Sequence, residues 1–215
     1  MTRPPLRPHP RSRARLVLLA LAAAAVLGAT LALAGCGGSK AHYTGFVRKP
    51  APDVSALSLP DMTAKGAPFT FRAADKGVLL VYFGYTLCPD VCPTTLSDVG
   101  VAVRSLTPEE QSRISVAFVT VDPARDTQPV MAHYIHSFFK DGHGLRTESA
   151  KELAAAAKAF GAAYKVTKAK SGEIDVIHSA FTYAVDDQGR LRLQWSFGTT
   201  KKAFADDIRT LLKSV

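Results

Sequence analysis

Two of the three cysteines in the 215-residue chain lie close together in the stretch YFGYTLCPDVCPTT, residues 82–95. Cys88 and Cys92 are separated by three residues, and each is followed by a proline. Such a pair can form a disulfide, act in thiol–disulfide exchange or supply two soft thiolate ligands to a metal such as copper(I) or zinc. Because redox motifs commonly have two intervening residues, the spacing alone leaves these chemistries open.

A copper site built on two thiolates is expected to have a third donor, and imidazole is the obvious type. Zinc also accepts two sulfurs and one nitrogen, but the general affinity order favours copper over zinc. The sequence offers several histidines after the N-terminal region: His42, His133, His136, His143 and His178. Only their expected positions in the fold can therefore indicate which histidine lies near the two cysteines.

The cysteines follow an apolar run and precede a predicted helix. The run GVLLVYFGY, residues 77–85, predicts a strand that is buried on both faces. Residues 93–106 predict a helix, and Pro93 suits its first position. The residue before a proline avoids the helical conformation, so we expect Cys92 at or near the helix N-cap. The helix dipole there should lower the pKa of a thiol, which suits both a nucleophile and a metal ligand.

The other segments predict an α/β fold. Strands are expected at residues 69–71 and 113–121 and in a hairpin, 178–185 and 191–197; helices are expected at 127–139, 147–161 and 201–215. With cysteines at the first strand–helix junction, this order predicts a thioredoxin-like fold, a central mixed sheet flanked by helices. His178 opens the hairpin, and such a sheet brings the start of that strand toward the cysteines. An ordinary strand-end histidine is the alternative, and His133 and His136 are expected on a helix surface.

The N-terminus predicts export and membrane attachment. Five arginines precede the apolar run of residues 16–34, and the sequence LAGC then ends at Cys36. This arrangement resembles the bacterial lipobox, in which the cysteine is lipidated and becomes the first mature residue. An uncleaved transmembrane anchor is the alternative. We expect a signal peptide at 1–35, a lipidated tether at 36–52 and a folded domain at 53–215, on the extracytoplasmic or periplasmic side of the cell membrane.

Removal of this leader changes the charge of the chain. The leader holds five of the 27 lysines and arginines and none of the 18 acidic residues, so the net charge falls from +9 to +4. This charge is too small to predict a nucleic-acid partner. If Cys36 carries lipid, only Cys88 and Cys92 remain as thiols. Outside the cytoplasm they are free to oxidise, so a structural disulfide is a serious alternative.

Three segments together resemble the Sco/SenC family: VLLVYFGYTLCPDVCPTTLSDV (78–99), FVTVDPARDT (118–127) and IHSAFTYAVDDQGRL (177–191). The resemblance implies a thioredoxin-fold, membrane-tethered copper protein that helps to assemble cytochrome c oxidase. It matches Cys88, Cys92 and His178 to the family's copper ligands. It also matches Asp122 and Asp126 to acidic positions of the family. Asp122 is therefore a candidate for a place near the metal ligands. The favoured alternative is that these residues only form a turn after the strand.

The chain departs from the family pattern at two positions. Ile177 stands where an acidic residue often precedes the histidine, which leaves in doubt what orients the imidazole ring. Leu87 stands where a histidine is common.

The resemblance leads to two main functional hypotheses. The first is a copper chaperone that takes copper from a donor protein and passes it by ligand exchange to the binuclear copper site of cytochrome c oxidase subunit II. The second is a thiol–disulfide oxidoreductase that uses Cys88 and Cys92 to reduce the cysteines of that site. Thioredoxin-like oxidoreductases carry a proline before the strand that faces the cysteines, whereas residues 171–185 contain none, which favours the chaperone. A binding module with a structural disulfide is the least favoured hypothesis, and an enzymatic activity is not the primary expectation.

Overall fold

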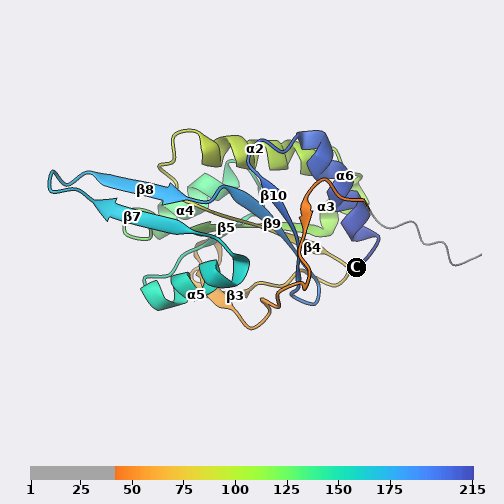
Figure 1. Ribbon diagram of the computed structural model, residues 1–215, viewed down its shortest axis with the longest axis horizontal. Coiled ribbons are helices and arrows are strands. Elements are labelled where there is room, and N and C mark those ends of the chain that lie inside the picture. Colours follow the sequence, from red (N-terminus) through yellow and green to blue (C-terminus); the bar gives the residue numbers. More distant parts are fainter. Residues whose placement is uncertain (1–41) are drawn as a thin grey trace, which may run out of the picture. The chain divides into compact units, whose positions relative to one another are not determined.

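A mixed sheet of eight strands forms the centre of the described domain (Figure 1). This computed structural model describes residues 42–215. In spatial order the strands are β1 (Phe46–Val47), β10 (Leu191–Ser196), β9 (Phe181–Asp186), β4 (Val78–Gly84), β5 (Ile114–Thr120), β6 (His143–Leu145), β2 (Ser58–Asp61) and β3 (Ala67–Thr70). The pairs β4–β5 and β5–β6 are parallel, and the other pairs are antiparallel.

Helices cover both faces of this sheet. They are the 3-10 turn η1 (Met62–Ala64) and the helices α2 (Val91–Arg104), α3 (Pro108–Ser112), α4 (Gln128–His136), α5 (Ala150–Phe160) and α6 (Lys201–Leu212). Helices α2 and α6 pack with even-numbered residues of β4 such as Leu80, whereas α5 packs with odd-numbered ones such as Val81. All seven residues of β4 are buried, as the apolar run predicts. The arrangement is the predicted thioredoxin-like fold.

Two helices have the ends that their sequences predict. Helix α5 ends at Gly161, which adopts a left-handed conformation with φ of 73°. Helix α4 has Thr127 at its N-cap position and Pro129 in its first turn, although the Thr127 side chain makes no capping hydrogen bond. The predicted start of α2 is wrong by two residues: the helix begins at Val91, so Cys92 lies inside it. Proline is tolerated within a first turn because the N–H groups there have no partner inside the helix.

The described part of the predicted tether, residues 42–52, packs on the domain. Strand β1 pairs with β10, and the backbone N–H groups of Thr44 and Gly45 donate to the buried carboxylate of Asp207 in α6. The same carboxylate accepts a hydrogen bond from Nε1 of Trp195. The predicted domain boundary is therefore too late. The predicted signal peptide, Cys36 and the tether up to residue 41 lie outside the described residues.

We expect Asp207→Ala to lower the free energy of unfolding by about 2–3 kcal/mol, because the buried indole N–H of Trp195 would lose its acceptor. Urea denaturation followed by tryptophan fluorescence measures this change. Asp206→Ala is the matched control, since Asp206 pairs with Lys202 and Arg209 at the surface. Equal stability of the two variants would contradict the anchoring role of Asp207.

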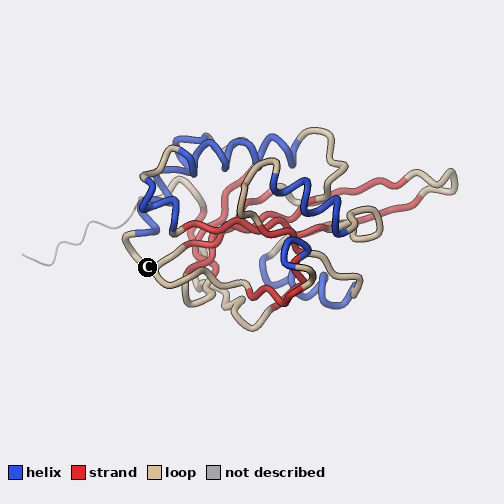
Figure 2. The backbone as a smooth tube through the Cα atoms, turned by 180° about the vertical axis from the view of Figure 1, so that it is seen from behind, coloured by secondary structure: helices blue, strands red, loops and turns tan. Residues whose placement is uncertain are grey.

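A second, two-stranded sheet was not predicted. Strands β7 (Tyr164–Lys168) and β8 (Ile174–His178) form an antiparallel hairpin that extends beyond the end of the central sheet (Figures 1 and 2). His178 therefore ends β8 and does not open the following strand, which begins at Phe181. Among the described residues, no helix combines the length and the apolar character needed to cross a membrane.

Candidate metal centre

Cys88, Cys92 and His178 meet at one end of β4. Their sulfur and imidazole nitrogen atoms all lie within 4.8 Å of one another, the one such group of three among residues 42–215. Nε2 of His178 lies 3.4 Å from Sγ of Cys92. The structure thus brings together three residues that span 90 positions in the sequence, and it leaves both cysteines as free thiols.

The two cysteines occupy different environments. Cys88 lies half-buried in the loop between β4 and α2, and its Sγ accepts a hydrogen bond from the backbone N–H of Cys92 at 3.3 Å. Cys92 lies in the first turn of α2 with its side chain fully buried against Tyr82 and Leu96. The helix N-terminus therefore faces the sulfur of Cys88 rather than that of Cys92.

This placement corrects the expected acidity of Cys92. Burial raises the pKa of the Cys92 thiol well above its ordinary value, and the neighbouring Cys88 raises it further. The expected lowering by the helix dipole is outweighed because desolvation penalises a buried thiolate more strongly. Cys92 is thus a protonated thiol at neutral pH unless a cation takes the place of its proton.

A backbone carbonyl orients the imidazole of His178. Nδ1 lies 3.2 Å from the carbonyl oxygen of Ser179, so the ring donates there and leaves the Nε2 lone pair facing Cys92. The ring stands edge-to-face against Tyr82 and Tyr85, with centroids at 6.0 and 5.9 Å. Burial lowers the pKa of His178, which favours the neutral ring that a metal requires.

This orientation answers the doubt raised by Ile177, because the ring needs no carboxylate partner. The two tyrosines were not singled out from the sequence. Tyr82 and Tyr85 are three residues apart in the motif YFGY. This spacing was the available signal, but it does not indicate that the ring of a distant histidine packs against both tyrosines.

A cleft gives access to the group of three donors. It encloses about 300 Å³ and is lined by Cys88 and His178 together with Tyr85, Pro89, Asp90, Val91, Val176, Ile177 and Ala180. Cys92 is absent from this lining and forms the buried side of the group. The two departures from the family pattern, Leu87 and Ile177, are 59% and 63% exposed, so both place an apolar side chain on the surface beside a candidate ligand.

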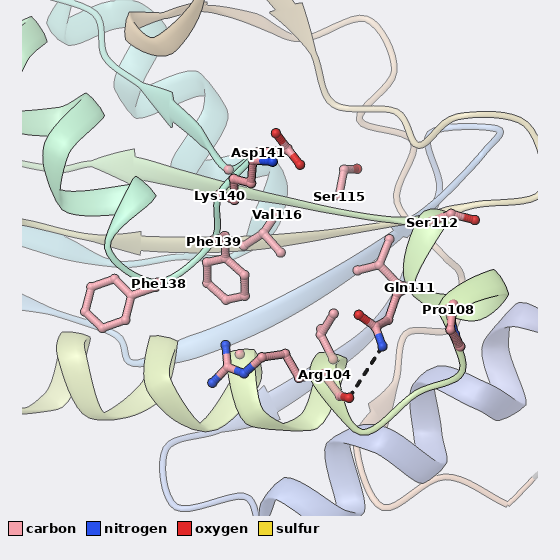
Figure 3. Close-up of a pocket in the computed structure, with 14 residues that line it drawn as sticks. Arg104, Pro108, Gln111, Ser112, Ser115, Val116, Phe138, Phe139, Lys140 and Asp141 are labelled. Carbon is pink, nitrogen blue, oxygen red and sulfur yellow. Dashed lines mark hydrogen bonds between the residues drawn. The ribbon is translucent and has the colours of Figure 1, made fainter.

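A larger cleft of about 630 Å³ lies elsewhere, between the end of α2 and the loop after α4 (Figure 3). Arg104, Gln111, Phe139 and Lys140 are among its lining residues. It contains neither cysteine nor histidine and so offers no soft metal ligand.

The other candidates lie apart from this group. His133 and His136 are exposed on α4, and His143 pairs with the buried Asp61. The carboxylate of Asp122 pairs with Arg125 in the turn after β5, as the turn interpretation predicts. The guanidinium of Arg125 lies 5.9 Å from the centre of the Tyr85 ring, so Asp122 reaches the candidate site only through two intervening side chains.

Gly84 leaves the space in which the sulfur of Cys92 sits. A Cβ atom at this position would lie 2.8 Å from Sγ of Cys92 and 3.0 Å from ring atoms of Phe118 and Tyr82. We expect Gly84→Ala to lower the free energy of unfolding by about 1–3 kcal/mol through overpacking, and to weaken metal binding by displacing Cys92. Urea denaturation and copper titration measure the two effects.

Gly100→Ala is the control for this substitution. Its Cβ would meet only the flexible guanidinium of Arg104, and alanine favours the helix. If Gly84→Ala is as stable as the control and binds copper equally well, the position of Cys92 does not depend on the space beside Gly84.

The distances suit a bound metal ion. Metal–sulfur and metal–nitrogen bonds are about 2.3 and 2.0–2.1 Å, so two ligand atoms on one ion lie up to about 4.6 Å apart. Shifts of a few tenths of an ångström would let one ion contact all three atoms. The hydroxyl group of Tyr82 is buried without a hydrogen-bond partner in the structure, and a metal-bound thiolate at Cys92 would give it an acceptor.

Comparison with known proteins identifies the family. The family model for SCO1/SenC matches residues 58–213. A mitochondrial SCO2 homolog from Bos taurus is 31% identical over 205 residues, covering 93% of this chain and 76% of that protein. The solution structure of apo Sco1 from Thermus thermophilus has a TM-score of 0.66 and 34% identity, covering 82% of this chain and 99% of that one.

A copper-bound structure is also similar. ScoI from Bradyrhizobium japonicum with copper bound has a TM-score of 0.60 and 29% identity, covering 71% of this chain and 95% of that one. Together with the matched family model, these similarities show that the chain belongs to the SCO1/SenC family.

Proposed function

We propose that the protein binds one copper ion through Cys88, Cys92 and His178 and acts in the assembly of cytochrome c oxidase. The observation that carries this proposal is the convergence of two thiols and a neutral imidazole within 4.8 Å beside an open cleft. Two thiolates select a soft ion, and the imidazole adds the borderline donor that also suits copper(II). Membership of the SCO1/SenC family supports copper over zinc.

The unequal exposure of the ligands suits delivery by ligand exchange. An incoming protein ligand can approach through the cleft next to Cys88 and His178, whereas Cys92 is fully buried. Replacement of one accessible ligand at a time would keep the ion bound during transfer. We infer that the acceptor is the binuclear copper site of cytochrome c oxidase subunit II and that a separate protein supplies the copper.

A thiol–disulfide exchange role is the second candidate. It is favoured by Cys88, a half-buried residue whose sulfur lies within 4.8 Å of the sulfur of the second free thiol, Cys92. Neither the imidazole at 3.4 Å from Cys92 nor its orientation by Ser179 is needed for that reaction. The metal role therefore accounts for more of the observed geometry.

Copper loading of the oxidase in cells tests the delivery step. Cells that lack this protein should contain oxidase subunit II without its copper when copper is limiting. The wild-type protein should restore the copper, and His178→Ala should not. Full restoration by His178→Ala at limiting copper would favour the thiol–disulfide role instead.

Membrane attachment through Cys36 belongs to the same proposal. We expect Cys36→Ser to remain an unprocessed precursor, because the lipobox cysteine is the site of lipid addition before cleavage. Gel mobility, mass spectrometry and metabolic labelling with a fatty acid measure processing and lipidation. A Cys36→Ser protein that is still cleaved, and still held in the membrane fraction, would contradict the lipid anchor.

A further inference from the structure

The carboxylate of Asp126 is fully buried and makes no ion pair within residues 42–215. It instead accepts hydrogen bonds from three groups. The backbone N–H of Thr86 donates to it at 3.1 Å, and the hydroxyl groups of Thr86 and Thr120 also donate to it. Its partners thus belong to the end of β5 and to the loop that leads to Cys88. A buried carboxylate is costly unless donors satisfy it, so this arrangement holds Thr86 firmly.

We propose that Asp126 is a positioning residue that fixes the sulfur of Cys88 relative to Cys92 and His178. This inference rests on the proposed copper function and names a residue on which that site depends. Only Leu87 separates Thr86 from Cys88, and the N–H of Cys88 donates to the carbonyl of Tyr85. The hydrogen bonds that tie Thr86 to Asp126, which we call the clamp on Thr86, therefore act directly on the turn that carries the sulfur.

Cys88 depends on this clamp more than the other two candidate ligands do. Cys92 is held in the core by helix α2, and His178 is held by pairing of β8 with β7 and by the flanking tyrosines. Cys88 lies in a loop and is only half-buried. Without the clamp, its sulfur would sample positions outside the reach of a shared ion.

The hydrogen-bond chemistry predicts which substitutions release the loop. The amide of Asp126→Asn keeps the volume but directs an NH₂ group at donors that need an acceptor. Thr86→Val removes the hydroxyl group with little change in shape, whereas Thr86→Ser retains it. We expect Asp126→Asn and Thr86→Val to be impaired and Thr86→Ser to be close to wild type.

The test uses the purified full chain with copper(II) and, separately, the reduced metal-free protein with iodoacetamide. We expect Asp126→Asn to weaken copper(II) binding by about tenfold or more, as loss of a residue that orients a ligand commonly does. Its sulfur-to-copper(II) absorption bands should shift and lose intensity. Without metal, Cys88 should be alkylated faster than in the wild type, while the rate at Cys92 should stay low.

Asp186→Asn is the matched control. Asp186 is also a buried aspartate that accepts backbone N–H groups, from Gln188 and Arg190, but it pairs opposite Val78 at the far end of β4. Its substitution should affect stability without changing the absorption bands or the alkylation of Cys88. Thr86→Val provides the same readouts if Asp126→Asn does not fold.

The outcomes separate the two proposals. Wild-type affinity, spectrum and alkylation in both Asp126→Asn and Thr86→Val would overturn the positioning role. A wild-type protein that binds no copper would overturn the proposed function, and the alkylation rates would still decide whether Asp126 positions Cys88.

Discussion

Copper(II) binding by His178→Ala is expected to be at least about tenfold weaker than binding by the wild type, a loss of about 1.4 kcal/mol. The variant keeps both thiols but loses the nitrogen that lies 3.4 Å from Cys92. Two sulfurs alone make a poor site for copper(II), which prefers additional nitrogen or oxygen ligands. Competition titration against a chromophoric copper(II) chelator measures the affinity.

Copper(I) and a second histidine provide the controls for this prediction. Copper(I) accepts two soft sulfur ligands, so its affinity should fall less than that of copper(II). His136→Ala should bind both ions as the wild type does, because His136 is exposed on α4 outside the group of three donors. An equal loss in His136→Ala, or no loss in His178→Ala, would show that His178 is not a ligand.

Alkylation of the reduced, metal-free protein should modify Cys88 on the order of a hundredfold faster than Cys92. Cys92 is fully buried, and burial raises the pKa of its thiol. Because only the thiolate reacts, each unit by which the pKa exceeds the solution pH reduces the reactive fraction about tenfold. Cys88 is half-buried and lines the cleft. Peptide mapping by mass spectrometry at pH 7 and successive time points gives both rates.

The difference in reactivity between the two cysteines also indicates which of them would attack first in the alternative thiol–disulfide exchange function. Cys88 would attack the substrate disulfide, and Cys92 would resolve the mixed disulfide from the buried side. Copper loading should protect both cysteines from alkylation. Equal rates for the two cysteines in the metal-free protein would contradict the inward placement of Cys92 and would require a more open start of α2.

The sequence predicted the elements that have strong patterns. The apolar run before the cysteines forms β4, and the Ala-rich segment forms α5 with Gly161 at its end. The hairpin β9–β10 and the final helix α6 are also present, although β9 begins at Phe181 rather than at the predicted His178. Each of these segments is long or bounded by a clear turn or cap signal, so local physics suffices to identify it.

Some strands were not predicted because their sequence signals are weak. Strands β7 and β8 have five residues each, and none of these residues is fully buried, so the short alternation of apolar and polar side chains was only a weak signal for strands. Strand β1 has two residues and no periodicity, and its anchor on Asp207 is a contact across more than 160 positions. Such contacts cannot be identified from one sequence.

The candidate site likewise combines residues that the sequence predicted with contacts that only the structure reveals. The cysteines and the resemblance indicated the three candidate ligands, because residue type and order carry that information. The orientation of His178 by Ser179 and the clamp of Asp126 on Thr86 depend on tertiary contacts. Asp126 lies 40 positions from Thr86. No local sequence pattern indicates this contact, and Arg125, the sequence neighbour of Asp126, pairs with Asp122 instead.

The copper content of the purified reduced protein tests the central claim most directly. After copper(I) loading under anaerobic conditions and removal of excess metal, elemental analysis should find one copper per chain in the wild type. A Cys88→Ser, Cys92→Ser double variant with an unchanged circular dichroism spectrum should retain none. Retention of one copper per chain by the folded double variant would contradict the account, because the ion would then be bound without the two sulfurs.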